Sequence, residues 1–528
     1  MTDILVVGAG PVGLTMAAEL ARHGVRCRIV DRLATPSPYC RAIGVTPRTL
    51  EVWDDMGIVR DMIDAGLWIE GLRSIIQGHP PGDALHDLSD LPYAQLGLPQ
   101  YETERLLARH LDRFGVNVER GTGLRALHQD GEGVAVTLER PDGGTERASF
   151  RYVVGCDGAH SAVRHALGIA FEGEALPRMF MLGDVHVDWD LPRGMALRAL
   201  RLVEGAPPDM FIAIPLPEAG RYRVSMLAPN EPGPGAGSDH GIQSEVHGPD
   251  LAEIQAVAEN LVPGNPRLSD LRWSSMFRIS MRLAARYRQG RAFLAGDAAH
   301  IHPPTGGQGM NTGIQDAYNL AWKLALVVSK KAPDTLLDSY EAERRPVGAE
   351  VVARTRAASE SYGRENKPDR LADTQILVSY CGTAWVRDDA GEGAAGPGPG
   401  AGDRAPDAVG LRRRGVGAPV RLHDVLRGTD HVLVVHLLPG AAPDFAAVAG
   451  EIVSRTGLSL RIVGIAADDG GVDPPGIALY RDSDGAFGKK YGLPGAAFLV
   501  RPDGYVGWRG ASYRDGGILA YLDRISRR

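Results

Sequence analysis

The first 31 residues carry the pattern that most constrains the fold. Residues 8–13 have the pattern Gly-x-Gly-x-x-Gly and join an apolar run at 3–7 to a helix-like segment at 11–23. A second short apolar run ends at Asp31. Glycines let the backbone approach a pyrophosphate, and the amino end of the following helix offers N–H groups and partial positive charge. The sequence therefore predicts a Rossmann-like dinucleotide-binding unit, with Asp31 placed to bind ribose hydroxyls. The loop alone does not distinguish NAD from FAD.

Composition narrows the class of protein further. The 528 residues include 58 Lys or Arg and 65 Asp or Glu, and the formal net charge of −7 argues against a nucleic-acid partner. The four cysteines have no Cys-x-x-Cys spacing, and no ligand pattern surrounds His300 and His302, so we expect neither a disulfide scaffold nor a metal site. No apolar run is long enough to cross a bilayer. We therefore expect a cytoplasmic protein with no membrane partner.

Two further motifs lie downstream. Residues 155–164 read Gly-Cys-Asp-Gly-Ala-His-Ser-Ala-Val-Arg, and residues 296–311 run from Gly-Asp-Ala-Ala-His to Gly-Gly-Gln-Gly-Met-Asn, where a long apolar stripe begins. Together with residues 8–13, these motifs resemble the FAD-dependent aromatic hydroxylases, which are the single-component class A flavoprotein monooxygenases. The resemblance covers residues 1 to about 350. The C-terminal region resembles the thioredoxin-like domain of the phenol and polyketide hydroxylases in that family.

The resemblance implies a fold that is α/β and α+β. It has a Rossmann-like FAD-binding domain, an inserted antiparallel-sheet substrate domain and a C-terminal thioredoxin-like domain. The expected divisions are 1–170 for the first part of the FAD-binding domain, 171–285 for the substrate-binding β-sheet domain, 286–390 for the second part of the FAD-binding domain with a helical segment, 391–402 for a Gly/Pro-rich linker and 403–528 for the thioredoxin-like domain. Thioredoxin chemistry needs a Cys-x-x-Cys pair, so this last domain should be redox-inert.

The resemblance also implies a set of cofactor-binding residues. The glycines of the first motif would hold the FAD pyrophosphate, and Asp297 would bond to the ribityl or pyrophosphate side. Residues 306–311 would place a helix amino end against the flavin pyrimidine edge, where N–H donors stabilise the negative charge of the reduced flavin. The full set is Gly8, Gly10, Pro11, Val12, Gly13, Asp31, Arg32, Arg41, Gln100, Asp157, Arg164, Asp297, Pro304, Gly307, Gly309, Met310 and Asn311.

The segment from 170 to 285 is the expected substrate chamber. It holds 7 of the 12 methionines: Met179, Met181, Met195, Met210, Met226, Met276 and Met281. Methionine is flexible and packs well on aromatic faces, so we expect these side chains to line an adaptable apolar pocket for a flat ligand. Tyr222 is the candidate catalytic base in this segment. His300 is expected to be a packed, hydrogen-bonded residue rather than an acid–base group.

The activity that the resemblance implies is oxygenation of a small aromatic substrate. NADPH or NADH would reduce FAD, and O2 would then form a flavin hydroperoxide that hydroxylates a phenolic or polycyclic aromatic compound. Because only one nucleotide-binding fold is evident, the nicotinamide donor would dock transiently beside Asp157, Arg164 and Arg41. The alternatives are Baeyer–Villiger-type oxygenation of a polyketide ketone, or a flavin-bound binding or sensor protein without turnover. A homodimer is one assembly that the chain could form.

Overall fold

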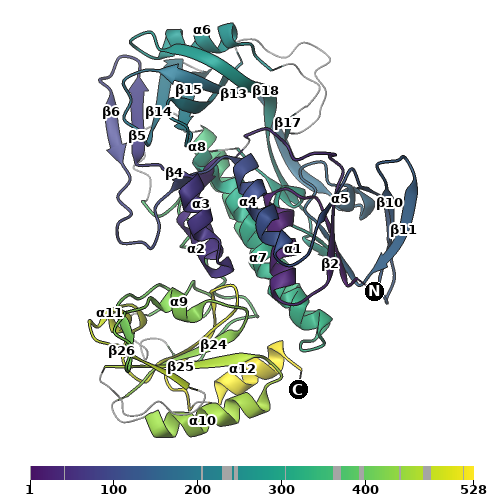
Figure 1. Cartoon of the computed structure of the whole chain (residues 1–528), viewed down its shortest axis with the longest axis vertical. Coiled ribbons are helices and arrows are strands. Elements are labelled where there is room, and N and C mark those ends of the chain that lie inside the picture. Colours follow the sequence, from purple (N-terminus) through teal and green to yellow (C-terminus); the bar gives the residue numbers. More distant parts are fainter. Residues whose placement is uncertain are drawn as a thin grey trace.

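The computed structural model describes residues 2–527, except 41, 204–205, 229–240, 243–247, 304, 361–369, 392–397, 439–441, 468–476 and 515. The largest sheet and the C-terminal unit lie at opposite ends of the molecule, with α1 (Pro11–Arg22) and α7 (Gln308–Val328) between them (Figure 1). Within the described part of the chain, no helix combines the length and apolar character needed to span a membrane.

A largely parallel sheet forms the predicted Rossmann-like unit. Its strand order is β19 (Arg288–Gln289), β20 (Ala292–Leu294), β12 (Tyr152–Gly155), β1 (Ile4–Val7), β2 (Cys27–Asp31) and β8 (Val118–Arg120). All four residues of β1 are buried, as expected for a central strand of a largely parallel sheet. Pro11 opens α1, where its fixed φ suits the first helical turn. Helix α1 packs against α7 and α4 (Gln100–Asp112).

Smaller elements complete this half of the chain. They are β3 (Gly44–Val45), α2 (Pro47–Met56), α3 (Val59–Ala65), β4 (Leu67–Trp68), β7 (Leu96–Gly97), β9 (Gly123–Gln129), β10 (Val134–Glu139), β11 (Thr145–Phe150) and α5 (Ala162–Ala166). Strands β10 and β11 pair antiparallel and form the hairpin expected around residues 141–144. Strand β7 pairs with both β3 and β4.

The second sheet is larger than the predicted inserted domain. Its order is β17 (Gly241–Ile242), β18 (Arg267–Ala284), β13 (Phe171–Asp188), β16 (Arg221–Leu227), β15 (Ala206–Pro215), β14 (Met195–Val203), β5 (Gly71–Ile76) and β6 (Gly82–Leu85), and β21 (His300–Ile301) pairs with β18. Strands β5 and β6 come from outside residues 171–285, and the β14–β5 pair is parallel. Sequence periodicity missed β6 because all four of its residues are exposed at the sheet edge.

One face of this sheet is covered by α6 (Leu251–Leu261) (Figure 1). An apolar cluster fills the space between them and includes Val185, Phe211, Val224, Ile254 and Ala258. Helix α6 begins with a capping box, in which Asp250 and Glu253 each bond to the other's backbone N–H. The opposite face of the sheet is therefore the one left for the rest of the molecule.

Helices α7 and α8 (Asp338–Glu360) are long helices that pack against each other. The apolar stripe predicted α7, and it is buried almost throughout its 21 residues. The short helices η1 (Gly296–Ala298) and η2 (Thr305–Gly307) precede α7, and η3 (Asp334–Leu337) leads into α8.

The C-terminal unit is a seven-stranded sheet with helices, in agreement with the predicted thioredoxin-like domain. The strand order is β22 (Arg387–Asp388), β28 (Val506–Gly510), β27 (Ala497–Val500), β24 (His431–His436), β25 (Leu460–Ala466), β26 (Ile477–Asp482) and β23 (Leu411–Arg413). Its helices are α9 (Leu422–Leu426), α10 (Ala442–Arg455), α11 (Ala486–Tyr491) and α12 (Gly517–Ile525). No cysteine occurs after Cys381, so this unit carries no thiol pair.

Buried charges join the C-terminal unit to α7 and α8. Arg501, at the end of β27, donates to both carboxylate oxygens of Glu343 on α8, at 2.7 and 3.0 Å. Lys323 of α7 donates to the same carboxylate at 2.7 Å. Asp503 accepts from Arg501 Nη2 at 2.5 Å and from Asn319 Nδ2 at 3.1 Å. Burial raises the pKa of Glu343, but Arg501 and Lys323 outweigh it and hold that pKa at about 2.

Glu343→Gln should destabilise the folded protein by about 3–5 kcal/mol, because it leaves Lys323 and Arg501 buried with one balancing charge fewer. Urea unfolding followed by circular dichroism measures this loss. Glu451→Gln is the matched control, since Glu451 pairs with Arg455 on an exposed helix surface and its loss should cost less than about 1 kcal/mol. Equal unfolding midpoints for Glu343→Gln and the wild type would contradict the structural role of this cluster.

Candidate active site

The glycine loop is built to bring backbone close to a ligand. Gly8 has a φ of +100°, and a Cβ built on it would lie 2.3 Å from the Cys156 carbonyl oxygen. A Cβ on Gly13 would lie 1.8 Å from the Gly8 carbonyl oxygen, so packing alone excludes side chains at both positions. A Cβ on Gly10 would meet no atom within 4 Å. Gly10 therefore faces open space at the amino end of α1, where the residues fit an approaching pyrophosphate.

Asp31 lies at the end of β2, directly beside the glycine loop. Its Oδ2 accepts a hydrogen bond from the Ala9 N–H at 2.7 Å, and its Oδ1 accepts one from the Leu33 N–H at 2.8 Å. Arg120 Nη1 lies 3.8 Å from Oδ2. Asp31 thus anchors the loop through Ala9, while the neighbouring Arg32 is exposed.

Val12 packs the glycine loop, which is the first motif, against residues 296–311, which we call the second motif. Residues 155–164 are the third motif. A Cβ built on Gly296 or on Gly313 would lie 2.8 or 2.6 Å from Val12 Cγ2, so each glycine makes room for that side chain. The second motif follows β20 as the short helix η1, in which Asp297 is exposed. Asp297 thereby lies on the outer side of the same junction.

Asp316, on α7, holds the second motif in place from within. Its Oδ2 accepts from the Gly296 N–H at 3.1 Å and lies 2.8 Å from His300 Nε2, and its Oδ1 accepts from Arg344 Nε at 2.8 Å. Burial raises the pKa of Asp316, but Arg344 and His300 outweigh it and hold that pKa below its usual value. His300 is packed and hydrogen-bonded, as expected. Asp316 and Arg344 were missed, because an acid within an apolar helix stripe and an arginine 28 residues away give no joint pattern.

The third motif is tied to the second through Arg164. Asp157 accepts from Ser161 Oγ, the N-cap of α5, at 2.5 Å and from the Val163 N–H at 3.2 Å. Burial raises the pKa of Asp157. Arg164 is 2% exposed and donates to the carbonyl oxygens of Ala298 and Ala159, at 2.9 and 2.7 Å. The expectation that Arg164 forms part of a surface for the nicotinamide donor is therefore wrong, because backbone carbonyls enclose its guanidinium.

The amino end of α7 meets residues 42–46, which include β3. Gly306 and Gly307 both have positive φ, 73° and 65°. Asn311 is fully buried; its Nδ2 donates to the carbonyl oxygens of Gly307 and Gly44 at 2.7 and 2.8 Å, and its Oδ1 accepts from the Thr46 N–H at 3.0 Å.

Gln100 secures the other end of that segment. Its Oε1 accepts from the Ala42 N–H at 3.2 Å, and its Nε2 donates to Glu104 at 2.8 Å. Met310 is buried, and Gly309 lies against His302. Arg41 and Pro304, both expected to contact FAD, lie outside the described residues.

The face of the large sheet opposite α6 turns toward Tyr39, Cys40 and Ile43. Ile214 of β15 and Trp273 of β18 pack with Cys40 and Ile43, and Tyr39 meets Trp273 edge-on at 5.7 Å between ring centroids. The same face carries an apolar cluster of Phe180, Leu200, Met210, Ile212 and Leu227. These apolar side chains thus lie on the face of the sheet opposite α6.

Tyr222 lies on the other face of the sheet. It is 5% exposed, belongs to the cluster beneath α6 and meets Trp189 at 4.9 Å between ring centroids. Its expected role as catalytic base is therefore wrong, because α6 covers the side of the sheet toward which it points. Met181, Met226 and Met276 pack in the same cluster, whereas Met210 lies on the opposite face. The expected methionine-lined pocket fails for those three residues.

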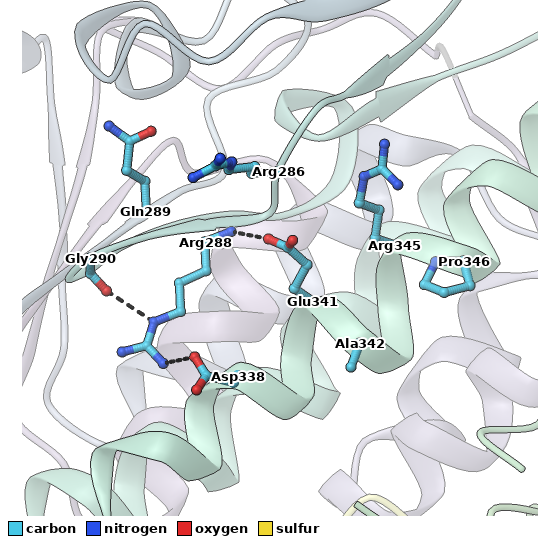
Figure 2. Close-up of a pocket in the computed structure, with 9 residues that line it drawn as sticks. All are labelled: Arg286, Arg288, Gln289, Gly290, Asp338, Glu341, Ala342, Arg345 and Pro346. Atoms are coloured by element: carbon cyan, nitrogen blue, oxygen red, sulfur yellow. Dashed lines mark hydrogen bonds and ion pairs between the residues drawn. The ribbon is translucent and has the colours of Figure 1, made fainter. Parts of the chain in front are cut away.

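A hollow of about 670 Å³ lies elsewhere, between α8 and the β18–β19 region (Figure 2). Its charged side chains largely satisfy one another and the backbone. Arg288 donates to Asp338 at 2.6 Å and to the Gly290 carbonyl oxygen at 3.0 Å, and Glu341 accepts from the Tyr287 and Arg288 N–H groups. The hollow shares no lining residue with the three motifs, so it is separate from the candidate site that they form.

Comparisons with known proteins agree with this geometry. A family model described as an FAD binding domain matches residues 1–355. The chain is 34% identical to a 12-dehydrotetracycline 5-monooxygenase/anhydrotetracycline 6-monooxygenase of Streptomyces rimosus, over 96% of this chain and 95% of that protein. It is 31% identical to pentachlorophenol 4-monooxygenase of Sphingobium chlorophenolicum, over 99% and 96% of the two chains.

A solved structure extends the likeness to the whole fold. The complex of aklavinone-11 hydroxylase with FAD and aklavinone superposes with a TM-score of 0.78 at 27% identity, covering 99% of each chain. The glycine loop, the Asp297 turn and the amino end of α7 are thus set in a fold shared over its full length. The chain belongs to the FAD-dependent aromatic hydroxylases, the class A flavoprotein monooxygenases.

Proposed function

We propose that this FAD-dependent monooxygenase hydroxylates a phenolic, polycyclic aromatic compound of the polyketide type. The observation that carries the proposal is the apolar sheet face, with Phe180, Ile212 and Leu227, that turns toward the segment held between Gln100 and Asn311. A flat aromatic ligand buries its faces against such a surface. Tetracycline-type and aklavinone substrates in the names of relatives support a polycyclic ring system.

The residues that would hold FAD come from the glycine loop, the end of β2 and residues 296–311. We assign the pyrophosphate to the Gly8–Gly13 loop and the adenosine ribose to Asp31, beside Arg32. Asp297 would accept a hydrogen bond from a ribityl hydroxyl, since a carboxylate beside phosphate would be repelled. The amino end of α7 at Gly307 would face the flavin pyrimidine edge, with Gly309, Met310 and Asn311 behind it. When bound, FAD transfers electrons from NAD(P)H to O2 and delivers one oxygen atom to the aromatic ring.

The protein's own contribution would be positioning and exclusion of water. The fixed N–H groups at the amino ends of α1 and α7 offer partial positive charge without reorganisation. The apolar face of the sheet would cover the reacting ring and keep water from it. The relatives are named as monooxygenases. These names favour neither Baeyer–Villiger oxygenation nor a sensor without turnover.

Two finer expectations belong to the same proposal. All four cysteines are free, which suits a reducing compartment such as the cytoplasm. Asp157 keeps its proposed place near the nicotinamide donor, although Arg164 does not. A homodimer remains a prediction.

Gly10→Ala should lower FAD affinity at least about tenfold while the FAD-free protein keeps its stability within about 1 kcal/mol, because the added Cβ meets no protein atom. Equilibrium dialysis against FAD and urea unfolding of the FAD-free protein measure the two effects.

Gly13→Ala is the contrasting variant. Its Cβ would lie 1.8 Å from the Gly8 carbonyl oxygen, so this change should destabilise the fold itself by about 1–3 kcal/mol or more. Wild-type FAD affinity in Gly10→Ala would remove the glycine loop from the cofactor site.

An aromatic substrate should accelerate reduction of the bound flavin by NAD(P)H. A ligand that favours one flavin position shifts the balance by its differential affinity alone, which at about 3 kcal/mol allows a change on the order of a hundredfold. Screening polycyclic phenols for stimulated NAD(P)H oxidation, with product mass under ¹⁸O₂, identifies substrates, and stopped-flow reduction measures the acceleration. If the flavin is reduced at the same rate with and without a compound that the enzyme hydroxylates, the substrate does not control flavin reduction and this prediction is refuted.

A further inference from the structure

A short segment after α8 packs against the first turns of α7. In this segment, Arg370–Ile376, the backbone of Gln375 adopts a positive φ of 60° and its side chain is buried. Gln375 Nε2 donates to Gln308 Oε1 at 2.7 Å and to Thr312 Oγ1 at 2.9 Å, and Gln375 Oε1 accepts from Gln315 Nε2 at 2.6 Å. One side chain thus reaches three positions on α7. We refer to residues 370–376 as the strap.

Gln308 connects the strap to the flavin-facing turn. Its Nε2 donates to the Gly306 carbonyl oxygen at 3.1 Å and lies 3.2 Å from both the carbonyl oxygen and Oδ1 of Asp373. Its Oε1 also accepts from Arg354 Nη2 at 3.2 Å. Gln308 is 1% exposed, so this network fixes the turn without help from solvent.

The carboxylate of Asp373 lies close to the Gly306–Gly307 turn. A Cβ built on Gly306 would lie 3.0 Å from Asp373 Oδ1, so a side chain at 306 would collide with the carboxylate. Burial raises the pKa of Asp373 above its usual value, although Arg354 and His86 lower it in part. A carboxylate is thus held beside the amino end of α7, where the helix dipole is positive.

The other end of the strap bonds to the loop between β6 and β7. Arg370 pairs with both carboxylate oxygens of Asp90, at 2.5 and 2.9 Å, and donates to the Asp87 carbonyl oxygen at 2.9 Å. The Arg48 N–H donates to the Thr374 carbonyl oxygen at 3.2 Å. The strap therefore links an edge of the large sheet with the turn that precedes α7.

We propose that Asp373 is a positioning residue, which fixes the Gly306–Gly307 turn through Gln308 and whose charge weakens the stabilisation that α7 offers to reduced flavin. The proposal rests on the proposed function, in which this turn lies against the flavin pyrimidine edge. A negative charge near that edge opposes the negative charge gained on reduction. The geometry and the charge of Asp373 act on different measurable quantities.

Asp373→Asn and Asp373→Ala separate the two contributions. The amide keeps an acceptor for Gln308 Nε2 but loses the charge, so Asp373→Asn should keep FAD affinity within about twofold and raise the midpoint potential of the bound flavin. The alanine loses both, so Asp373→Ala should also speed hydrogen exchange of the amides at 306–312 and weaken FAD binding. Asp83→Asn is the matched control, because Asp83 is an exposed acid on β6 that pairs with Arg73 of β5. This variant should change none of these readouts.

The outcomes are distinguishable from failure of the proposed function. Hydrogen exchange needs no FAD, so unchanged exchange in Asp373→Ala overturns the positioning role whatever the flavin does. A potential at or below the wild-type value in Asp373→Asn overturns the charge role. If Gly10→Ala loses FAD while both Asp373 variants behave as the wild type, the flavin site stands and the strap has no part in it.

Discussion

The buried carboxylate of Asp316 is the interaction on which the rest of the site depends. A charge in the interior costs several kcal/mol of desolvation unless its partners are well placed. Here the Arg344 guanidinium, the His300 ring and the Gly296 N–H surround it. These partners come from α8, the strand that follows η1 and η1 itself, so the compensation of one charge sets how three elements meet. Asp297 can face outward because Gly296, its neighbour, is fixed from inside.

The C-terminal unit extends the same principle to the far end of α7. Lys323 and Glu343 meet Arg501 and Asp503 in a second buried cluster, about four turns of helix beyond the amino end of α7. This unit has no cysteine of its own, and its buried charged cluster packs it against α7 and α8. It packs against α7, which carries Asp316, and against α8, which carries Arg344.

Local sequence patterns predicted those parts of the fold whose cause is local. The first β–α–β unit, the hairpin around residues 141–144 and α7 each follow from periodicity and turn residues within a short window. Tyr222, Val224 and Met226 share one face of β16, and only the position of α6 shows that this face is buried beneath a helix. Gln308 and Gln375 lie 67 residues apart in the chain, so no window could pair them. Arg164 matched its motif, yet its burial depends on Ala298 in a distant motif.

The choice of arginine at position 164 has a consequence for how the site responds to pH. Burial lowers the pKa of Lys323 to about 8, so a buried ammonium can lose its proton in mildly alkaline solution. A guanidinium starts from a far higher pKa and offers a fork of donors that reaches Ala298 and Ala159 together. The contact that aligns the second and third motifs therefore keeps its charge across the range in which lysines and histidines titrate. A change in the charge of Arg164 is therefore not a source of pH dependence in this region.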